Sequence, residues 1–172
     1  MGIIHDLYMK YLHLYKTEKY AKKVGVHFGA NFHAYGYVMY GSEPWAISIG
    51  DNVFITNNVT FITHDGGTLL FRKTVPDLEI TKPITIGNNV FIGMNTTILP
   101  GVNIGNNVVI GAGSVVSKSI PDNSVYAGNP ARFIKTTDDY FKKIKEQSLH
   151  LGHLKGKEKD EQLRRIFPEL GQ

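Results

Sequence analysis

Residues 86–121 read IGNNVFIGMNTTILPGVNIGNNVVIGAGSVVSKSIP, and this stretch decides the fold because it repeats every six residues. Each of its six units begins with Ile or Val, and four of the six continue with Gly. The fifth position of every unit is small or β-branched. The residues that begin the units are Ile86, Ile92, Ile98, Ile104, Ile110 and Val116.

The six-residue period argues against a helix and predicts stacked coils. Six is not close to a multiple of roughly 3.6, and each Gly would cost a helix about 1 kcal/mol. A short strand followed by a turn fits the pattern: its aliphatic residue points inward, and its Gly or Asn takes the strained corner. Stacked coils would then bury a continuous ladder of Ile and Val. An antiparallel sheet with hairpin turns would instead space its strands unevenly, about eight to twelve residues apart.

Composition indicates one soluble globular domain. The chain has 172 residues, of which 42% are hydrophobic and 20% charged, as is usual for such domains. No apolar run approaches the roughly 18 residues of a membrane span. His5, Asp6 and Lys10 interrupt the N-terminal stretch where a signal peptide would be apolar, so export is not expected. The absence of cysteine excludes disulfides and thiolate chemistry, and is compatible with the predicted cytoplasmic location.

The net charge of +4 is modest and suits an anionic small ligand. No basic run or aromatic platform accompanies it, so nucleic acid is not an expected partner.

Three segments are predicted along the chain. Residues 1–23 form an N-terminal helical segment, because apolar residues recur there at helical spacing. Residues 24–135 form the β-helical domain. The repeat is interrupted at 65–82, which must leave the coils as a protruding loop, and such insertions often carry binding function. Residues 136–172 form a charged, helical C-terminal tail.

The repeat, the Thr63-His64-Asp65 motif and the run Gly128-Asn-Pro-Ala-Arg132 together resemble the hexapeptide-repeat acyltransferases. The maltose, galactoside and capsular-polysaccharide O-acetyltransferase branch is the most similar, over roughly residues 28–135. The resemblance implies a mainly β protein folded as a left-handed parallel β-helix. It also implies acetyl-CoA as acyl donor, and a homotrimer whose active sites lie between subunits.

His64 is the predicted catalytic residue. It follows a repeat unit and precedes the loop, and the imidazole of histidine titrates near neutral pH, as a general base requires. The resemblance implies that it takes the proton of the acceptor hydroxyl during attack on a thioester. Asp65 follows where the sugar acetyltransferases often have Pro, and is either an acceptor contact or a turn residue.

The resemblance also implies residues that bind coenzyme A. Lys118, Arg132 and Lys135 match family positions near the nucleotide phosphates, and Met94 and Ala112 match positions along the pantetheine arm. The small residues on either side of Ala112 would let the arm lie against backbone.

The acceptor pocket is sought among the aromatic residues of the segment before the first clear repeat. Aromatic rings stack on the apolar faces of sugars, and a carboxylate can orient hydroxyls. These side chains could equally pack a subunit interface or the helical cap. The candidates are Tyr35, Tyr37, Tyr40, Glu43 and Trp45.

The predicted function is acetyl-CoA-dependent O-acetylation of a sugar or glycan, as in polysaccharide modification. An N-acetyltransferase for an amino sugar or an antibiotic is the alternative within the same class. A β-helical carbonic anhydrase would need three zinc-binding histidines; His27, His33 and His64 could supply some, but no His lies between Asp65 and Leu149, and no metal is expected. A non-catalytic scaffold is disfavoured by the His64 and Arg132 motifs.

Overall fold

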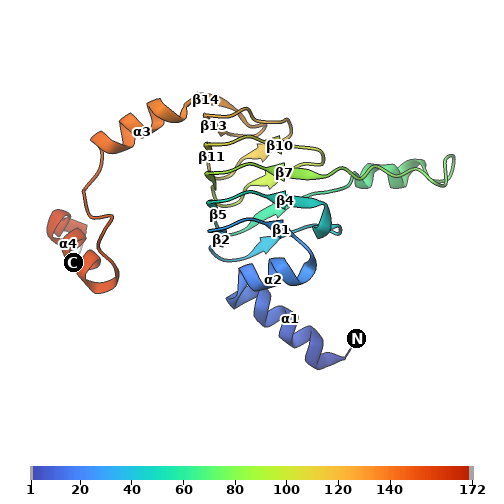
Figure 1. Cartoon of the computed structure of the whole chain (residues 1–172), viewed down its shortest axis with the longest axis horizontal. Coiled ribbons are helices and arrows are strands. Elements are labelled where there is room, and N and C mark those ends of the chain that lie inside the picture. The colour runs from blue at the N-terminus through green and yellow to red at the C-terminus, as the bar shows by residue number, and fades with distance from the viewer. Residues whose placement is uncertain (1, 171–172) are drawn as a thin grey trace. The chain divides into compact units, whose positions relative to one another are not determined.

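The computed structural model describes residues 2–170 and contains a parallel β-helix. Its coils are triangular, and each side of the triangle stacks into one parallel sheet (Figure 1). The first sheet contains β1 (His27–Phe28), β4 (Ile47–Ile49), β7 (Ile84–Ile86) and β10 (Asn103–Ile104). The second contains β2 (His33–Ala34), β5 (Val53–Ile55), β8 (Val90–Ile92), β11 (Val108–Ile110), β13 (Ser124–Ala127) and the antiparallel β14 (Arg132–Thr136). The third contains β3 (Val38–Met39), β6 (Val59–Phe61), β9 (Thr97–Ile98) and β12 (Val115–Val116).

The core is the ladder of residues at the first and fifth positions of the repeat units. All twelve of these residues between 86 and 120 are buried, and the side chains of Thr96 and Ser114 are buried among the aliphatic ones. Successive coils stack in register, as in the series Val53, Val90 and Val108 of the second sheet. The predicted inward ladder of Ile and Val is therefore confirmed.

The corner positions differ from the sequence prediction. The residue with left-handed backbone is the fourth of the unit, usually Asn, as at Asn89 (φ 57°) and Asn107 (φ 56°). The Gly at the second position has an ordinary φ and is required by close stacking. A Cβ on Gly87 would lie 2.7 Å from the carbonyl oxygen of Gly105 in the next coil, closer than real Cβ contacts. The Gly thus avoids a steric clash between stacked coils, and the Asn adopts the left-handed backbone of the corner.

The same Asn position makes a hydrogen-bonded column along one corner. Side-chain amides connect five asparagines from successive coils, with N···O distances of 2.6, 2.7, 3.0 and 2.9 Å. This column satisfies the polar groups of the turns and links each coil to the next. Its members are Asn31, Asn52, Asn89, Asn107 and Asn123.

The N-terminal end of the solenoid is covered by two helices, α1 (Ile3–Tyr15) and α2 (Thr17–Val24), which occupy the segment predicted to be helical. The break lies at Lys16, whose backbone (φ −140°, ψ 58°) is not helical. Thr17 then donates a hydrogen bond to the carbonyl of Ala34 in the first coil, so α2 lies against the solenoid, and Ala21 is fully buried there.

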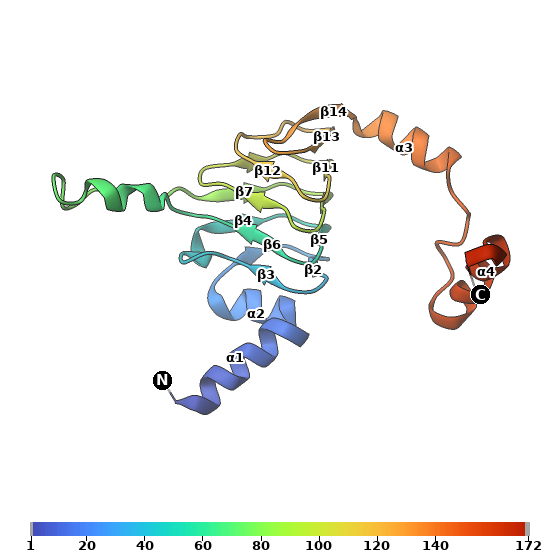
Figure 2. The ribbon, with the colours of Figure 1, turned by 180° about the vertical axis from the view of Figure 1, so that it is seen from behind.

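Residues 65–82 project away from the coils (Figure 2). At the base of this loop, Asp65 N donates to Ile80 O (2.9 Å) and Lys82 N donates to Thr63 O (2.8 Å). The short 3-10 helix η2 (Gly66–Phe71) follows, capped by the Asp65 carboxylate, which accepts from Gly67 N. A second 3-10 turn, η1 (Pro44–Ala46), lies between β3 and β4.

The chain divides into two compact units, residues 1–137 and 138–172. The C-terminal part contains α3 (Thr137–Glu146), α4 (Gly156–Ile166) and the short η3 (Pro168–Leu170). Within residues 2–170, no helix has both the length and the apolar character to cross a bilayer.

Candidate functional site

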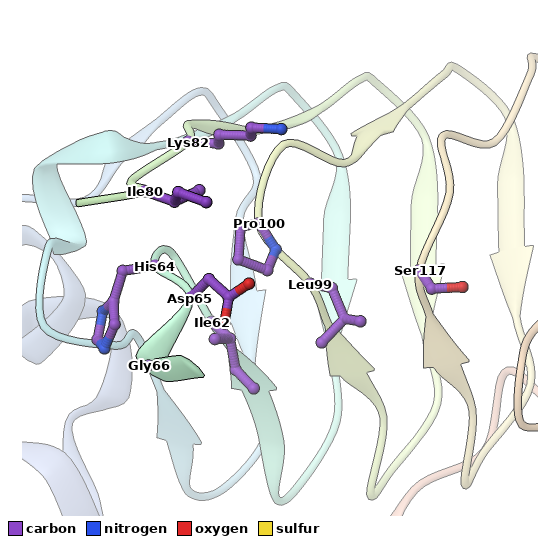
Figure 3. Close-up of a pocket in the computed structure, with 9 residues that line it drawn as sticks. All are labelled: Ile62, His64, Asp65, Gly66, Ile80, Lys82, Leu99, Pro100 and Ser117. Atoms are coloured by element: carbon purple, nitrogen blue, oxygen red, sulfur yellow. The ribbon is translucent and has the colours of Figure 1, made fainter. Parts of the chain in front are cut away.

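A cleft of about 450 Å³ opens where the protruding loop leaves the solenoid (Figure 3). Its floor is a row of residues that follow the strands of the third sheet in successive coils: Ile62, Leu99 and Ser117. Ile80 and Lys82 of the returning loop line the opposite side. The cleft is therefore elongated along the solenoid axis, with one wall from the coils and one from the loop.

A second cleft, of about 290 Å³, also lies at the base of the loop. Its lining is mostly polar and comes from the segment before η1 and from the loop. Arg72 and Glu79 form an ion pair there (2.6 Å), and Arg72 Nε also donates to Leu78 O. The lining residues are Ser42, Glu43, His64, Gly66, Thr68, Leu69, Arg72 and Glu79.

His64 is shared by the two clefts. Its Nδ1 lies 3.1 Å from Oε2 of Glu43, and the same carboxylate oxygen accepts a hydrogen bond from the hydroxyl of the fully buried Thr63. A carboxylate can only accept, so Nδ1 carries the proton of the neutral ring. Nε2 is then the nitrogen with a free lone pair.

The surroundings of Glu43 favour its ionised form. The hydrogen bond from Thr63, and then the hydrogen bond and charge attraction of His64, hold the pKa of Glu43 below its ordinary value of 4.5, against the opposing effect of desolvation. Glu43 was considered as an acceptor contact from sequence alone; the structure places it beside the imidazole.

The predicted coenzyme A residues lie at two different corners of the solenoid. Met94 and Ala112 are exposed and occupy successive coils at the corner between the second and third sheets. Arg132 begins β14, pairs with Ala127 and is exposed. Lys118 is one residue beyond Ser117, at the corner that carries the first cleft.

Lys135 is half-buried in β14, opposite Val125. None of the five predicted coenzyme A residues lines either of the two clefts at His64.

The aromatic acceptor candidates line neither cleft. Tyr37 stacks on His13 of α1, with ring centroids 4.0 Å apart. Tyr40 is 3% exposed and stacks on Phe61 inside the coil, so it is a core residue, because the coil continues through β3 instead of leaving the solenoid. Tyr35 is exposed beside His33, and Trp45 is exposed in η1.

Comparison with known proteins gives consistent matches. The bacterial transferase hexapeptide model (six repeats) matches residues 83–118. Protein CapG of Staphylococcus aureus is 46% identical over 165 residues, which cover 95% of this chain and 96% of CapG. Galactoside O-acetyltransferase of Escherichia coli (strain K12) is 43% identical over 128 residues, 72% of this chain and 62% of that protein.

A solved structure, galactoside acetyltransferase in complex with coenzyme A, superimposes with a TM-score of 0.59 at 32% identity. The match covers 90% of this chain and 87% of that one. The chain belongs to the hexapeptide-repeat acetyltransferase family. The predicted left-handed parallel β-helix and the predicted branch of the family are confirmed, and the protein is an acyltransferase.

Several lining residues of this acetyltransferase were missed from sequence, although a signal for them exists. Within 86–121, the two repeat units that lack Gly at the second position are those with Leu99 and Ser117. These residues line the first cleft. The second position at this corner therefore carries a side chain into the cleft, where the other corners need Gly for stacking. The loop residues Arg72 and Glu79 gave no such signal.

Among residues 2–170, no group of three or more His, Cys, Asp or Glu side chains is arranged to hold a metal ion. His33 lies in β2 of the second sheet, away from His64. Its ring stacks on Phe54, and its Nδ1 is 3.9 Å from Oε1 of Glu18.

Proposed function

We propose that this acetyltransferase transfers an acetyl group from acetyl-CoA to a hydroxyl of a sugar or glycan, with His64 as general base. The observation that carries the proposal is the position of His64 between two clefts, with Nδ1 on Glu43. A ring held in this way leaves Nε2 free at the junction of the clefts, where a donor and an acceptor could meet.

In the proposed reaction, Nε2 takes the proton of the acceptor hydroxyl as its oxygen attacks the thioester carbonyl. A C–O bond forms, the C–S bond of the tetrahedral intermediate breaks, and the thiolate of coenzyme A takes the proton back from the imidazolium. Glu43 stabilises the transient imidazolium by its charge and fixes the ring orientation, as an orienting carboxylate does in hydrolytic triads.

We assign the first cleft to the pantetheine arm of coenzyme A. The cleft is elongated along the coils, and its floor is the apolar edge of Ile62 and Leu99 ending at Ser117, next to Lys118. The galactoside acetyltransferase with a similar fold was solved with coenzyme A. In this assignment Lys118 would meet a phosphate of the nucleotide end.

We assign the second cleft to the acceptor. Its hydroxyl, carboxylate and guanidinium groups suit a hydroxyl-rich molecule. The Arg72–Glu79 pair neutralises both charges, which favours an acceptor without net charge at this place. Sugar acceptors are also named for the galactoside relative.

A homotrimer with sites between subunits would complete the donor site. Met94, Ala112 and Arg132 occupy a different corner from Lys118, with the third sheet between them, and we infer that one donor site combines one corner from each of two subunits. The outward residues Phe54, Phe91 and Val109 of the second sheet are aligned in register, which supports this sheet as the face for association.

The proposal is tested with free thiol release from acetyl-CoA, measured over matched panels of sugars and amino sugars. His64→Ala should lower turnover by about 10²–10⁴-fold, while coenzyme A affinity, measured by calorimetry on the same preparation, stays unchanged. Hydroxylamine treatment of the product distinguishes an ester from the amide of the alternative N-acetyltransferase. A His64→Ala variant that binds coenzyme A and retains more than about a third of its turnover would refute the general base.

Arg132→Ala and Lys118→Ala should each weaken coenzyme A binding by about 1.5–3 kcal/mol if they contact phosphates. Light scattering tests the trimer; a 19.2 kDa monomer would contradict it.

A further inference from the structure

Helix α1 has an exposed apolar face that no described residue of the chain covers. At roughly 3.6 residues per turn, seven residues fall within an arc of roughly 140°, and no polar residue lies inside that arc. Their exposed fractions range from 46% to 84%. The residues of this face, called the α1 apolar face below, are Ile3, Ile4, Leu7, Tyr8, Tyr11, Leu14 and Tyr15.

The orientation of α1 is fixed by its opposite side. Leu12 is buried, and the ring of His13 lies between Tyr20 and Tyr37, with centroid distances of 3.9 and 4.0 Å. His13 Nε2 is also 2.6 Å from the carbonyl oxygen of Val38. These contacts hold the apolar face away from the solenoid, and α1 lies beyond the first coil and points away from it (Figure 1).

The charges beside this face are predominantly positive. Lys10 borders one edge of the arc, and the ammonium of Lys23 lies 5.8 Å from the ring centroid of Tyr8 at the other edge. The remaining exposed lysines of the helix pair are Lys16, Lys19 and Lys22.

The acidic groups lie elsewhere. Asp6 is on the side of α1 beyond Lys10, and Glu18 is directed to the first coil, where it accepts from Ala34 N. An apolar arc with three tyrosines and lysines at both edges has the character of a helix that lies in a membrane interface.

We propose that the α1 apolar face binds the surface of a bilayer that contains anionic phospholipid. The aliphatic residues would enter the acyl boundary, the tyrosines would lie at headgroup level, and the lysines would meet lipid phosphates. A second copy of the chain is the competing occupant. The face proposed above for subunit contact, Phe54, Phe91 and Val109, is on the second sheet and does not include α1.

The test is co-sedimentation of the full chain with sucrose-loaded vesicles, either of phosphatidylcholine alone or mixed with phosphatidylglycerol. The wild type should bind the mixed vesicles at least about tenfold better, and high salt should reduce the difference. Leu7→Glu with Tyr11→Glu should lower binding to both by about tenfold or more. Lys10→Gln with Lys23→Gln should remove the preference for the mixed vesicles and keep the weaker binding to phosphatidylcholine.

Leu70→Glu, at a still more exposed leucine of the protruding loop, is the control for an added surface charge and should bind as the wild type does. Circular dichroism and thermal unfolding report whether each variant is folded. Failure of the wild type to bind mixed vesicles would overturn the proposal. So would unchanged binding of Leu7→Glu with Tyr11→Glu, or a lower oligomeric mass of that variant by light scattering, because a second copy would then cover the face.

Discussion

Two kinds of region differ in burial and in the polar groups that they contribute. One is the coils of residues 84–120, and the other is the two segments that leave the solenoid, 41–46 and 65–82. In the coils every inward position is buried, and backbone hydrogen bonds run from each coil to the next. The two departing segments have little buried apolar surface, yet they supply most of the polar groups around His64. The regular coils thus form the rigid framework that positions the site, and the irregular segments supply most of its polar side chains.

The contact between the two departing segments depends on one coil residue and one glycine. Thr63 is fully buried and donates to Glu43, which was brought there by the preceding turn of the solenoid. Gly41 has φ 67°, and a Cβ there would lie 2.9 Å from the carbonyl oxygen of Phe61. Only a residue without a side chain allows this close approach, so Gly41 sets the path that carries Glu43 to His64.

The largest difference between the two kinds of region should appear on truncation of an apolar side chain. Ile92 is fully buried in β8, so Ile92→Ala should lower the free energy of unfolding by about 2–5 kcal/mol. Leu70, in the loop, is 81% exposed, and Leu70→Ala should change it by less than about 0.5 kcal/mol. Urea unfolding at one fixed protein concentration measures both. Equal losses would mean that the loop is packed in the assembled protein.

The same contrast explains what could be predicted from sequence. The period, the inward ladder and the exit of the chain after His64 follow from local rules, because each unit repeats the same environment. The link between Glu43 and His64 could not be predicted, because it depends on the path of a non-repeating turn. Tyr40, one of the acceptor candidates, lies instead in the core next to β3, a strand that the flanking Gly36 and Gly41 made difficult to recognise in the sequence.

The next comparison is between a glycine of the coils, Gly87, and a glycine of the protruding loop, Gly66. Gly87 and Gly66 both have ordinary φ, so only space distinguishes them. A Cβ on Gly87 meets backbone atoms of the next coil at 2.7–2.8 Å, whereas a Cβ on Gly66 meets nothing within 4 Å. Gly87→Ala should therefore cost about 1–3 kcal/mol of stability, and Gly66→Ala less than about 0.5 kcal/mol. Thermal unfolding of both variants checks this, and a stable Gly87→Ala protein would show that the coils can separate locally.

A smaller effect is expected where a departing segment meets the coil, at Glu43. Glu43→Gln keeps the shape but removes the charge, so kcat should fall about 10- to 100-fold, as for groups that act through a histidine. KM for acetyl-CoA should not change, because Glu43 lines the cleft that we propose for the acceptor. Equal effects on KM and kcat would indicate a substrate contact instead of a positioning role.

Glu43 should also contribute to acid stability. Its folded pKa is lowered, so its contribution is present above the unfolded value of 4.5 and is lost as pH falls through the folded pKa. Wild-type stability should therefore decline more steeply than that of Glu43→Gln below about pH 4.5. Urea midpoints measured from neutral to acidic pH test the sign; a parallel decline in both proteins would contradict it.

The smallest expected effect separates a core tyrosine from an acceptor contact. The hydroxyl of Tyr40 is buried and has no hydrogen-bond partner within residues 2–170, and burial raises the pKa of Tyr40, so the group remains a neutral O–H. An unpaired buried hydroxyl is destabilising. Tyr40→Phe removes it without changing the ring that stacks on Phe61, and should raise the free energy of unfolding by about 1 kcal/mol. Turnover and acceptor KM should be unchanged.

Tyr35→Phe, at an exposed ring, should leave stability unchanged and is the control. A rise in acceptor KM in Tyr40→Phe would return this tyrosine to the acceptor site, and a loss of stability would mean that its hydroxyl is bonded in the assembled protein.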